Sequence, residues 1–254
     1  MLLFRSVIFN IVFIVNILFQ LVFWSPIFFF LPREDGWKIV KCIAWSCLWL
    51  QHKIIGSTFD FRGMENIPAN AGCIIASKHQ STWETYTMLL FLADPSYILK
   101  RELLFLPFFG WFAWKMDVVG VNRGKKGEAL ASMTRNSRVQ YDEGRQIVIY
   151  PEGTRKMPGA EPNYKYGIVH LYNELNATIV PAALNSGLYW PRRSWYLYPG
   201  TLVLEFLKPI KKGLTKDKFK TKLEKTIETA TNALMDESAT GNNPPPKYLY
   251  EKSA

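Results

Sequence analysis

The sequence predicts an α/β fold: a mixed, largely parallel sheet flanked by helices and preceded by an N-terminal membrane-embedded helical segment. Three observations support this fold class. Residues 6–32 contain no charged side chain. After about residue 56, short apolar runs recur with turn residues between them, and segments compatible with helices alternate with those runs. Strands that alternate with helices are typical of a sheet covered by helices.

The N-terminal segment, residues 1–55, is predicted to be a membrane anchor. Its uncharged stretch is longer than the roughly 20 apolar residues that cross a bilayer, and the small-residue cleavage site of a signal peptide does not follow it. A second segment, Trp37 to Ile55, mixes lysines with tryptophan and leucine, as expected for a helix that lies among lipid headgroups. A helical hairpin and one span plus an interfacial helix both remain open.

Residues 56–239 are predicted to form one globular domain, since the chain is long enough for one sizeable core. The tail, residues 240–254, contains Asn-Asn-Pro-Pro-Pro and is expected to be flexible. The predicted strands are Cys73–Ala76, Ile147–Tyr150, Thr178–Leu184 and Thr201–Leu207, and the predicted helices are Trp83–Ala93, Gly127–Tyr141 and Lys165–Leu175.

The amino-acid composition limits the kinds of molecule that the protein is expected to bind. The net charge of +10 attracts phosphate-bearing molecules, nucleic acid and anionic lipid alike, whereas nine tryptophans suit a protein that meets lipid. Three cysteines without a Cys-x-x-Cys pair, and only three histidines, argue against a disulfide framework or a metal site. We therefore expect a domain that faces the reducing cytoplasm. The basic segment Lys211 to Lys225, with Arg192 and Arg193, is either solvated or in contact with anionic headgroups.

The first motif is His79 and Glu84, in a predicted strand, loop and helix. If His79 precedes the helix and Glu84 lies in its first turn, the carboxylate can fold back onto one imidazole nitrogen. The other nitrogen is then left to take a proton. Ser81 to Glu84 also fits a capping box, in which the glutamate only closes the helix end. The spacing alone does not separate these two roles.

The second motif is a predicted strand that ends in a Pro-Glu-Gly-Thr-Arg loop, residues 151–155. Such loops commonly carry binding sites in α/β folds. Gly153 allows a tight turn, and Arg155 offers a planar fork suited to a phosphate or carboxylate. A surface ion pair between Glu152 and Arg155 explains the loop equally well.

Together these motifs resemble the glycerolipid acyltransferase family, over about residues 60–207. The resemblance includes a second block between the motifs, the Tyr164 to Gly167 element and the Val180 to Ala182 element. In the second block the matching positions are Lys100, Leu103, Pro107, Gly110 and Arg123. One departure is Glu84, because the family usually has aspartate there.

The resemblance implies transfer of a fatty acyl group from acyl-CoA or acyl carrier protein to the sn-2 hydroxyl of 1-acylglycerol-3-phosphate, giving phosphatidic acid. His79 would be the general base and Glu84 its orienting partner. The thioester is a co-substrate, and no cofactor and no metal are implied. The implied partner is lipid rather than nucleic acid. The residues implied in substrate binding are Lys100, Arg123, Glu152, Gly153, Thr154 and Arg155.

Two other functions remain open at this stage. One is acylation of a different lysophospholipid or of an aminolipid, because the same blocks serve several acceptors. The other is a non-catalytic lipid-binding membrane protein, in which the pair only caps a helix. The aromatic run Leu103 to Trp114 fits an acyl channel, a membrane-dipping segment or a buried core helix.

Overall fold

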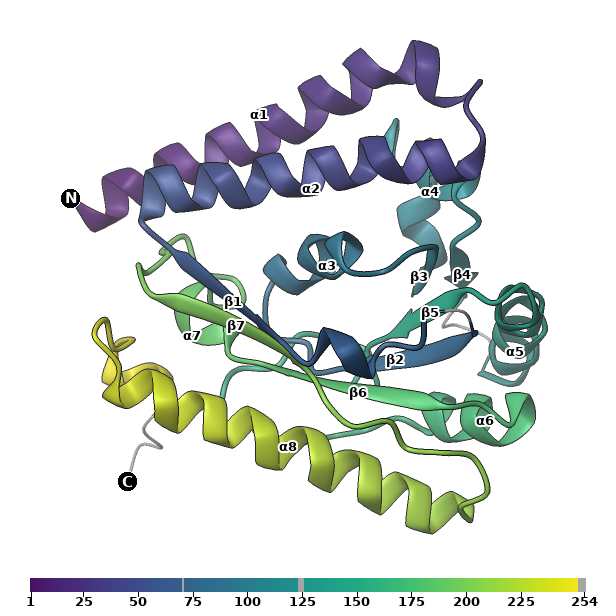
Figure 1. Ribbon diagram of the computed structural model, residues 1–254. Helices are drawn as coiled ribbons and strands as arrows, with labels where there is room; N and C mark the ends of the chain where they lie inside the picture. Colours follow the sequence, from purple (N-terminus) through teal and green to yellow (C-terminus); the bar gives the residue numbers. More distant parts are fainter. Residues whose placement is uncertain (70, 123–125, 251–254) are drawn as a thin grey trace.

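The structure, a computed structural model, describes residues 1–69, 71–122 and 126–250 of the 254. A seven-stranded sheet carries helices on both faces (Figure 1). The strands are β1 (Thr58–Arg62), β2 (Cys73–Ser77), β3 (Pro95–Lys100), β4 (Val119–Val121), β5 (Gln146–Ile149), β6 (Ile179–Leu184) and β7 (Thr201–Phe206). The helices are α1 (Leu2–Phe28), α2 (Arg33–Ile55), α3 (Trp83–Thr87), α4 (Phe109–Lys115), α5 (Lys126–Asp142), α6 (Tyr166–Leu175), α7 (Ser186–Tyr189) and α8 (Lys216–Thr240). Short 3-10 turns are η1 (Met64–Asn66), η2 (Met88–Leu90), η3 (Arg101–Phe105) and η4 (Lys247–Leu249).

The sheet has the strand order β1-β7-β6-β2-β5-β3-β4. Among the described residues, β6 and β7 pair antiparallel, and the other neighbouring strands run parallel. This confirms the predicted mixed, largely parallel sheet. Because β2, β5 and β3 are parallel neighbours, their carboxyl ends meet at one edge, and both sequence motifs begin there.

The apolar runs form strands because both faces of the sheet are covered. Cys73 and Ile75 of β2 face the core beneath α2 and α3, whereas Ile74 and Ala76 face the core beneath α6 and α8. Such strands read as continuous apolar runs. The sequence analysis did not predict three of the strands, because their sequence signals are weak. Strand β1 alternates apolar and charged residues, β3 begins with Pro95, and β4 has only three residues.

The first two helices form an antiparallel hairpin, joined by residues 29–32 (Figure 1). Polar side chains of α1 form hydrogen bonds between the two helices. Gln20 Nε2 and Asn16 Nδ2 donate to Ser46 Oγ of α2, at 2.7 and 2.9 Å. The two helices therefore pack together as a pair, and how they enter a membrane stays a prediction. Helix α1 is long and apolar enough to cross a membrane by length and composition, which suggests membrane association.

One side of α1 packs on the globular domain and the other is exposed. The rings of Phe9 and Phe13 both meet Trp190 edge to face, with centroids 5.3 Å apart in each case, and the backbone N–H of Leu197 donates to Ser6 Oγ at 3.0 Å. The opposite side presents large apolar side chains that are at least half exposed: Phe4, Ile11, Ile14, Val15, Leu18, Phe19, Val22, Phe23 and Ile27. An exposed apolar stripe of this size is typical of a surface that contacts lipid or another protein.

Helix α8 covers the sheet face opposite the hairpin (Figure 1). Its apolar side chains Phe219, Leu223 and Ile227 are fully buried, and its lysines lie on the exposed side. These lysines thus lie across the sheet from the apolar hairpin, and a solvated face stays the prediction for them. Arg192 and Arg193 differ, because their loop contacts α1: Asn10 Nδ2 donates to the carbonyl of Trp195 at 3.1 Å.

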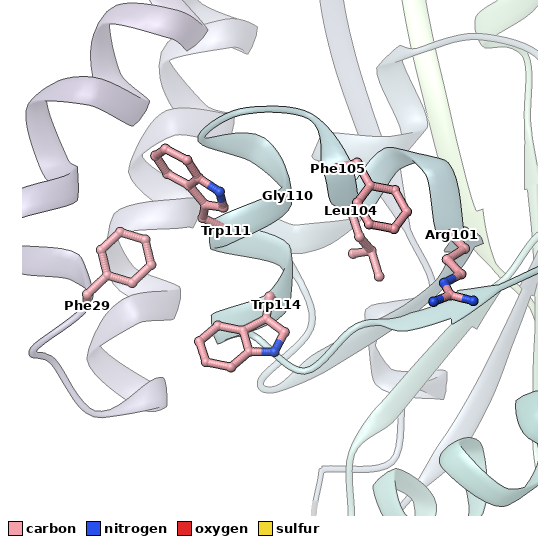
Figure 2. A pocket seen from close by; sticks show the side chains of 7 residues that line it. All are labelled: Phe29, Arg101, Leu104, Phe105, Gly110, Trp111 and Trp114. Atoms are coloured by element: carbon pink, nitrogen blue, oxygen red, sulfur yellow. The ribbon is translucent and has the colours of Figure 1, made fainter.

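The structure also bears on the predicted flexible tail and on the three alternatives for the aromatic run Leu103 to Trp114. The tail is not loose as far as Tyr250, since Leu249 of η4 is buried against the core. The aromatic run is not a wholly buried core helix, because Phe105 and Trp114 are both 73% exposed, although Phe112 is buried. Instead η3, which begins with Arg101, and α4 line an open apolar cavity of about 620 Å³ together with Phe29 (Figure 2).

Candidate active site

His79 lies immediately beyond the carboxyl end of β2. The preceding residue, Lys78, still donates its backbone N–H to Ala182 of β6 at 3.0 Å, so the sheet fixes the backbone up to the histidine. Helix α3 then begins at Trp83 and places Glu84 in its first turn. As a result, His79 Nδ1 lies 2.8 Å from Glu84 Oε1. The histidine side chain is 14% exposed and the glutamate side chain is fully buried.

The carboxylate of Glu84 is held by four hydrogen bonds. Oε1 accepts from His79 Nδ1 and from the backbone N–H groups of Gln80 and Ser81, each at 2.8 Å. Oε2 accepts from the hydroxyl of Ser186, also at 2.8 Å. Glu84 therefore closes the start of α3, as in a capping box, and orients His79 at the same time. The two roles that the spacing left open coexist.

This arrangement defines the proton positions on His79. Two backbone N–H groups donate to Glu84 Oε1, so that oxygen acts as an acceptor and the Nδ1 atom of a neutral His79 is the donor. The other ring nitrogen, Nε2, then carries a lone pair. A buried carboxylate also stabilises the imidazolium that forms when Nε2 takes a proton. A histidine held in this tautomer has the arrangement that a general base requires.

Ser186 is a functional candidate that the sequence argument missed. It is fully buried at the start of α7, two residues after the end of β6, and its hydroxyl is the partner of Glu84 Oε2. The same turn contacts the His79 loop a second time, because the N–H of Gly187 donates to Gln80 Oε1 at 3.1 Å. A signal did exist: Ser186 follows a predicted strand at the edge of the sheet where ligands bind.

The second motif lies against the first. The ring of Tyr150 stacks on the imidazole of His79, with centroids 4.0 Å apart and planes 21° apart. The N–H of Lys156 donates to the carbonyl of His79 at 2.8 Å. Burial raises the pKa of Tyr150 well above its ordinary value, so this ring stays neutral. Residues 151–155, the PEGTR loop, therefore begin and end beside His79.

Within the PEGTR loop the predicted substrate residues have different settings. Gly153 has a φ of +68°, a conformation that glycine adopts without strain. Thr154 is exposed and Arg155 is half-buried. Glu152 differs from the expected substrate contact: its side chain is 2% exposed and lies 3.2 Å from Lys78 Nζ, below the loop rather than on its surface.

Of the remaining candidates, Lys100 lies outside this cluster. Lys100 is exposed at the carboxyl end of β3, and β5 separates β3 from β2. It shares the sheet edge with His79, but two strands away. Arg123 lies outside the residues that the structure describes.

Comparison with known proteins identifies the family. A family model described as Acyltransferase matches residues 58–185, which begin with β1 and end one residue before Ser186. The chain is 35% identical over 184 residues to a 1-acyl-sn-glycerol-3-phosphate acyltransferase of Pseudomonas aeruginosa, covering 70% of this chain and 71% of the relative. It is 26% identical to the mouse protein 1-acyl-sn-glycerol-3-phosphate acyltransferase alpha, covering 72% of this chain and 64% of that one.

A solved structure shares the fold. The crystal structure of the 1-acyl-sn-glycerophosphate acyltransferase from Thermotoga maritima superposes with a TM-score of 0.77 at 20% identity, over 92% of this chain and 99% of that one. A likeness at this identity concerns the fold alone. The family match spans the strands and loops that carry both motifs, and the relative from Pseudomonas aeruginosa extends the similarity beyond them. The chain is a member of the acyltransferase family.

Proposed function

We propose that the chain transfers a fatty acyl group from a thioester, acyl-CoA or acyl carrier protein, to the sn-2 hydroxyl of 1-acyl-sn-glycerol 3-phosphate, giving phosphatidic acid. The observation that carries the proposal is the pairing of His79 Nδ1 with a fully buried Glu84 at 2.8 Å. The names of the two sequence relatives supply the acceptor. A helix cap alone would not need an imidazole beside the carboxylate.

The reaction follows from the geometry of the pair. His79 Nε2 removes the proton of the acceptor hydroxyl as its oxygen attacks the thioester carbonyl carbon. The new C–O bond forms, the C–S bond breaks, and the leaving sulfur takes the proton from the imidazolium. Glu84 keeps its charge throughout and stabilises the imidazolium, as the aspartate does in a serine protease triad.

Arg155, Arg123 and Lys100 are proposed to bind the phosphate of the acceptor. Arg155 is the best supported, because its loop is hydrogen-bonded to the His79 carbonyl through Lys156. Its guanidinium fork matches a phosphate. Gly153 and Thr154 would shape the space for the glycerol backbone. Glu152 holds the loop from below, so we assign it no substrate contact.

The hairpin supports an acceptor that stays in lipid. A lysophospholipid keeps its chain among other chains, whereas the thioester carrier is soluble. We propose that the apolar face of α1 rests in the membrane, with the catalytic domain on the cytoplasmic side. Arg192 and Arg193, beside α1, would then meet anionic headgroups at about 1 kcal/mol each.

One assay tests the function. Purified protein is incubated with labelled palmitoyl-CoA and, separately, palmitoyl-acyl carrier protein, together with a panel of lysolipids. Labelled phosphatidic acid from lysophosphatidic acid, lost in His79→Ala, is the expected result. If only another lysolipid were labelled, that lysolipid would be the acceptor and lysophosphatidic acid would not. No transfer to any member of the panel would favour the non-catalytic lipid-binding alternative.

A further inference from the structure

Lys78, the residue before His79, has its side chain on the opposite face of the sheet. Neighbouring side chains on extended backbone point to opposite faces. His79 meets Glu84 on the α3 side, whereas Lys78 Nζ lies 2.7 Å from Glu228 Oε1 of α8. The Lys78 side chain is only 3% exposed. A lysine is almost never buried this deeply unless it is paired.

Lys78 is the centre of a buried polar group of four residues, which we call the Lys78 cluster: Lys78, Glu152, Tyr164 and Glu228. The ammonium lies 2.7 Å from Glu228 Oε1 and 3.2 Å from Glu152 Oε2. Tyr164 donates its hydroxyl to the same Glu228 oxygen at 2.8 Å. One cation thus stands between two carboxylates that would otherwise repel each other.

The cluster joins segments that are far apart in the sequence. Glu152 lies three residues before Arg155 in the PEGTR loop, and Glu152 Oε1 also accepts from the N–H of Asn163 at 3.4 Å. The carbonyl of Pro151 accepts from the N–H of Lys165 at 2.9 Å. The PEGTR loop is therefore fixed at its start by residues 163–165 and at its end by the bond from Lys156 to the His79 carbonyl.

Helix α8 is a firm support for this arrangement. Phe219, Leu223 and Ile227 are fully buried against the sheet, and Glu228 directly follows the last of them. Its side chain is 19% exposed, so it reaches inward rather than into solvent. Yet α8 lies entirely after residue 185, where the family match ends.

We propose that Lys78 and Glu228 are positioning residues for acyl transfer. The Lys78 cluster holds the PEGTR loop, and with it Arg155, at a fixed place relative to His79, and α8 is its support. Buried ion pairs contribute little net stability because desolvation offsets their attraction, but they define geometry. A displacement of about 1 Å at a reacting centre can cost roughly 100-fold in rate. The inference rests on the proposed function, since it concerns binding of the acceptor phosphate.

The test uses the full chain in detergent micelles and two pairs of variants. Lys78→Met removes the ammonium and keeps an unbranched apolar stem, and Glu228→Gln removes a charge with almost no change of shape. Their matched controls are Lys222→Met and Asp236→Asn, which remove the same charges from exposed positions of α8. For each variant, KM and kcat are measured with lysophosphatidic acid and acyl-CoA varied separately, and thermal unfolding is followed by circular dichroism.

We expect Lys78→Met to lower kcat/KM for lysophosphatidic acid about 10- to 100-fold, mainly through KM, with KM for acyl-CoA within about twofold. Glu228→Gln should show the same pattern at about fivefold, because the amide still accepts from Tyr164. Lys78→Arg should restore most of the loss, and the two controls should match the wild type.

Three results would overturn the inference. The first is a wild-type KM for lysophosphatidic acid in both Lys78→Met and Glu228→Gln. The second is an equal rise in both KM values, and the third is a lower melting temperature with unchanged kinetics, which indicates a purely structural role. If Lys78→Met does not fold, the near-isosteric Glu228→Gln carries the test. An inactive wild type would instead refute the proposed function, so the two failures are distinguishable.

Discussion

Glu84→Gln is the sharpest test of the active site, because the structure shows what the substitution keeps. A glutamine has the same length, and its amide oxygen can take the place of Oε1, where three donors converge. Its NH₂ group then faces the hydroxyl of Ser186, which can accept as well as donate. The start of α3 stays closed, and only the negative charge beside His79 is lost.

The size of the effect follows from burial. Glu84 is fully buried at 2.8 Å from His79 Nδ1, and loss of one partner of a buried charged pair costs about 3–5 kcal/mol. The hydrogen bond to the amide oxygen persists, so we take the lower end. At about 1.36 kcal/mol for each tenfold change in rate, the expected loss in kcat is on the order of 10²-fold. Glu84→Asp keeps the charge but shortens the reach, and should lose about tenfold.

The assay measures release of free coenzyme A from acyl-CoA at saturating lysophosphatidic acid, with circular dichroism to verify folding. Ser81→Ala is the control, because the hydroxyl of Ser81 only accepts a long 3.4 Å bond from the Trp83 N–H and its backbone N–H remains; it should stay within about threefold. A folded Glu84→Gln protein with wild-type kcat would refute the argument, and helix capping would then be the whole role of Glu84.

Three other predictions concern single contacts. Ser186→Ala leaves Glu84 Oε2 without its hydroxyl donor, and kcat should fall about tenfold with little change in either KM; a change in KM alone would contradict a role through Glu84. Arg155→Ala should raise KM for lysophosphatidic acid about 10- to 100-fold, and an effect confined to acyl-CoA in the same kinetics would contradict the phosphate assignment. Burial raises the pKa of Glu152 above its ordinary 4.5, although Lys78 opposes the shift. A raised carboxyl pKa favours folding at low pH, and that contribution is lost as pH rises through the folded value. Glu152→Gln should therefore make the melting temperature fall less as pH rises above 4.5, and an unchanged slope would count against the shift.

The sequence was sufficient for the central strands and for the pair His79 and Glu84. Buried strands such as β2 have an unmistakable apolar run, and the pair is local in the chain. It was insufficient for β3, whose first residue is Pro95, and for β1, which pairs with β7 at the far end of the domain. Strand β1 is an edge strand and is only partly buried, so its sequence signal is weak.

Long-range contacts explain the remaining failures. Ser186 reaches Glu84 across 102 positions, and Glu228 reaches Lys78 across 150. Spacing within a motif contains no information about either partner. The same limit applies to Glu152, which looks like a ligand-binding loop residue until Lys78 is seen below it.

The junction between the hairpin and the sheet has a mechanical consequence. Gly56 ends α2 in a left-handed conformation, and only Ser57 separates it from β1. The carbonyl of Ser57 lies 2.8 Å from His52 Nδ1, so a hydrogen bond fixes the turn between α2 and β1. An enzyme tethered by a flexible linker would sample a range of heights and tilts above its substrate layer. In this chain the packing of the hairpin on the domain sets the distance from the apolar stripe of α1 to His79.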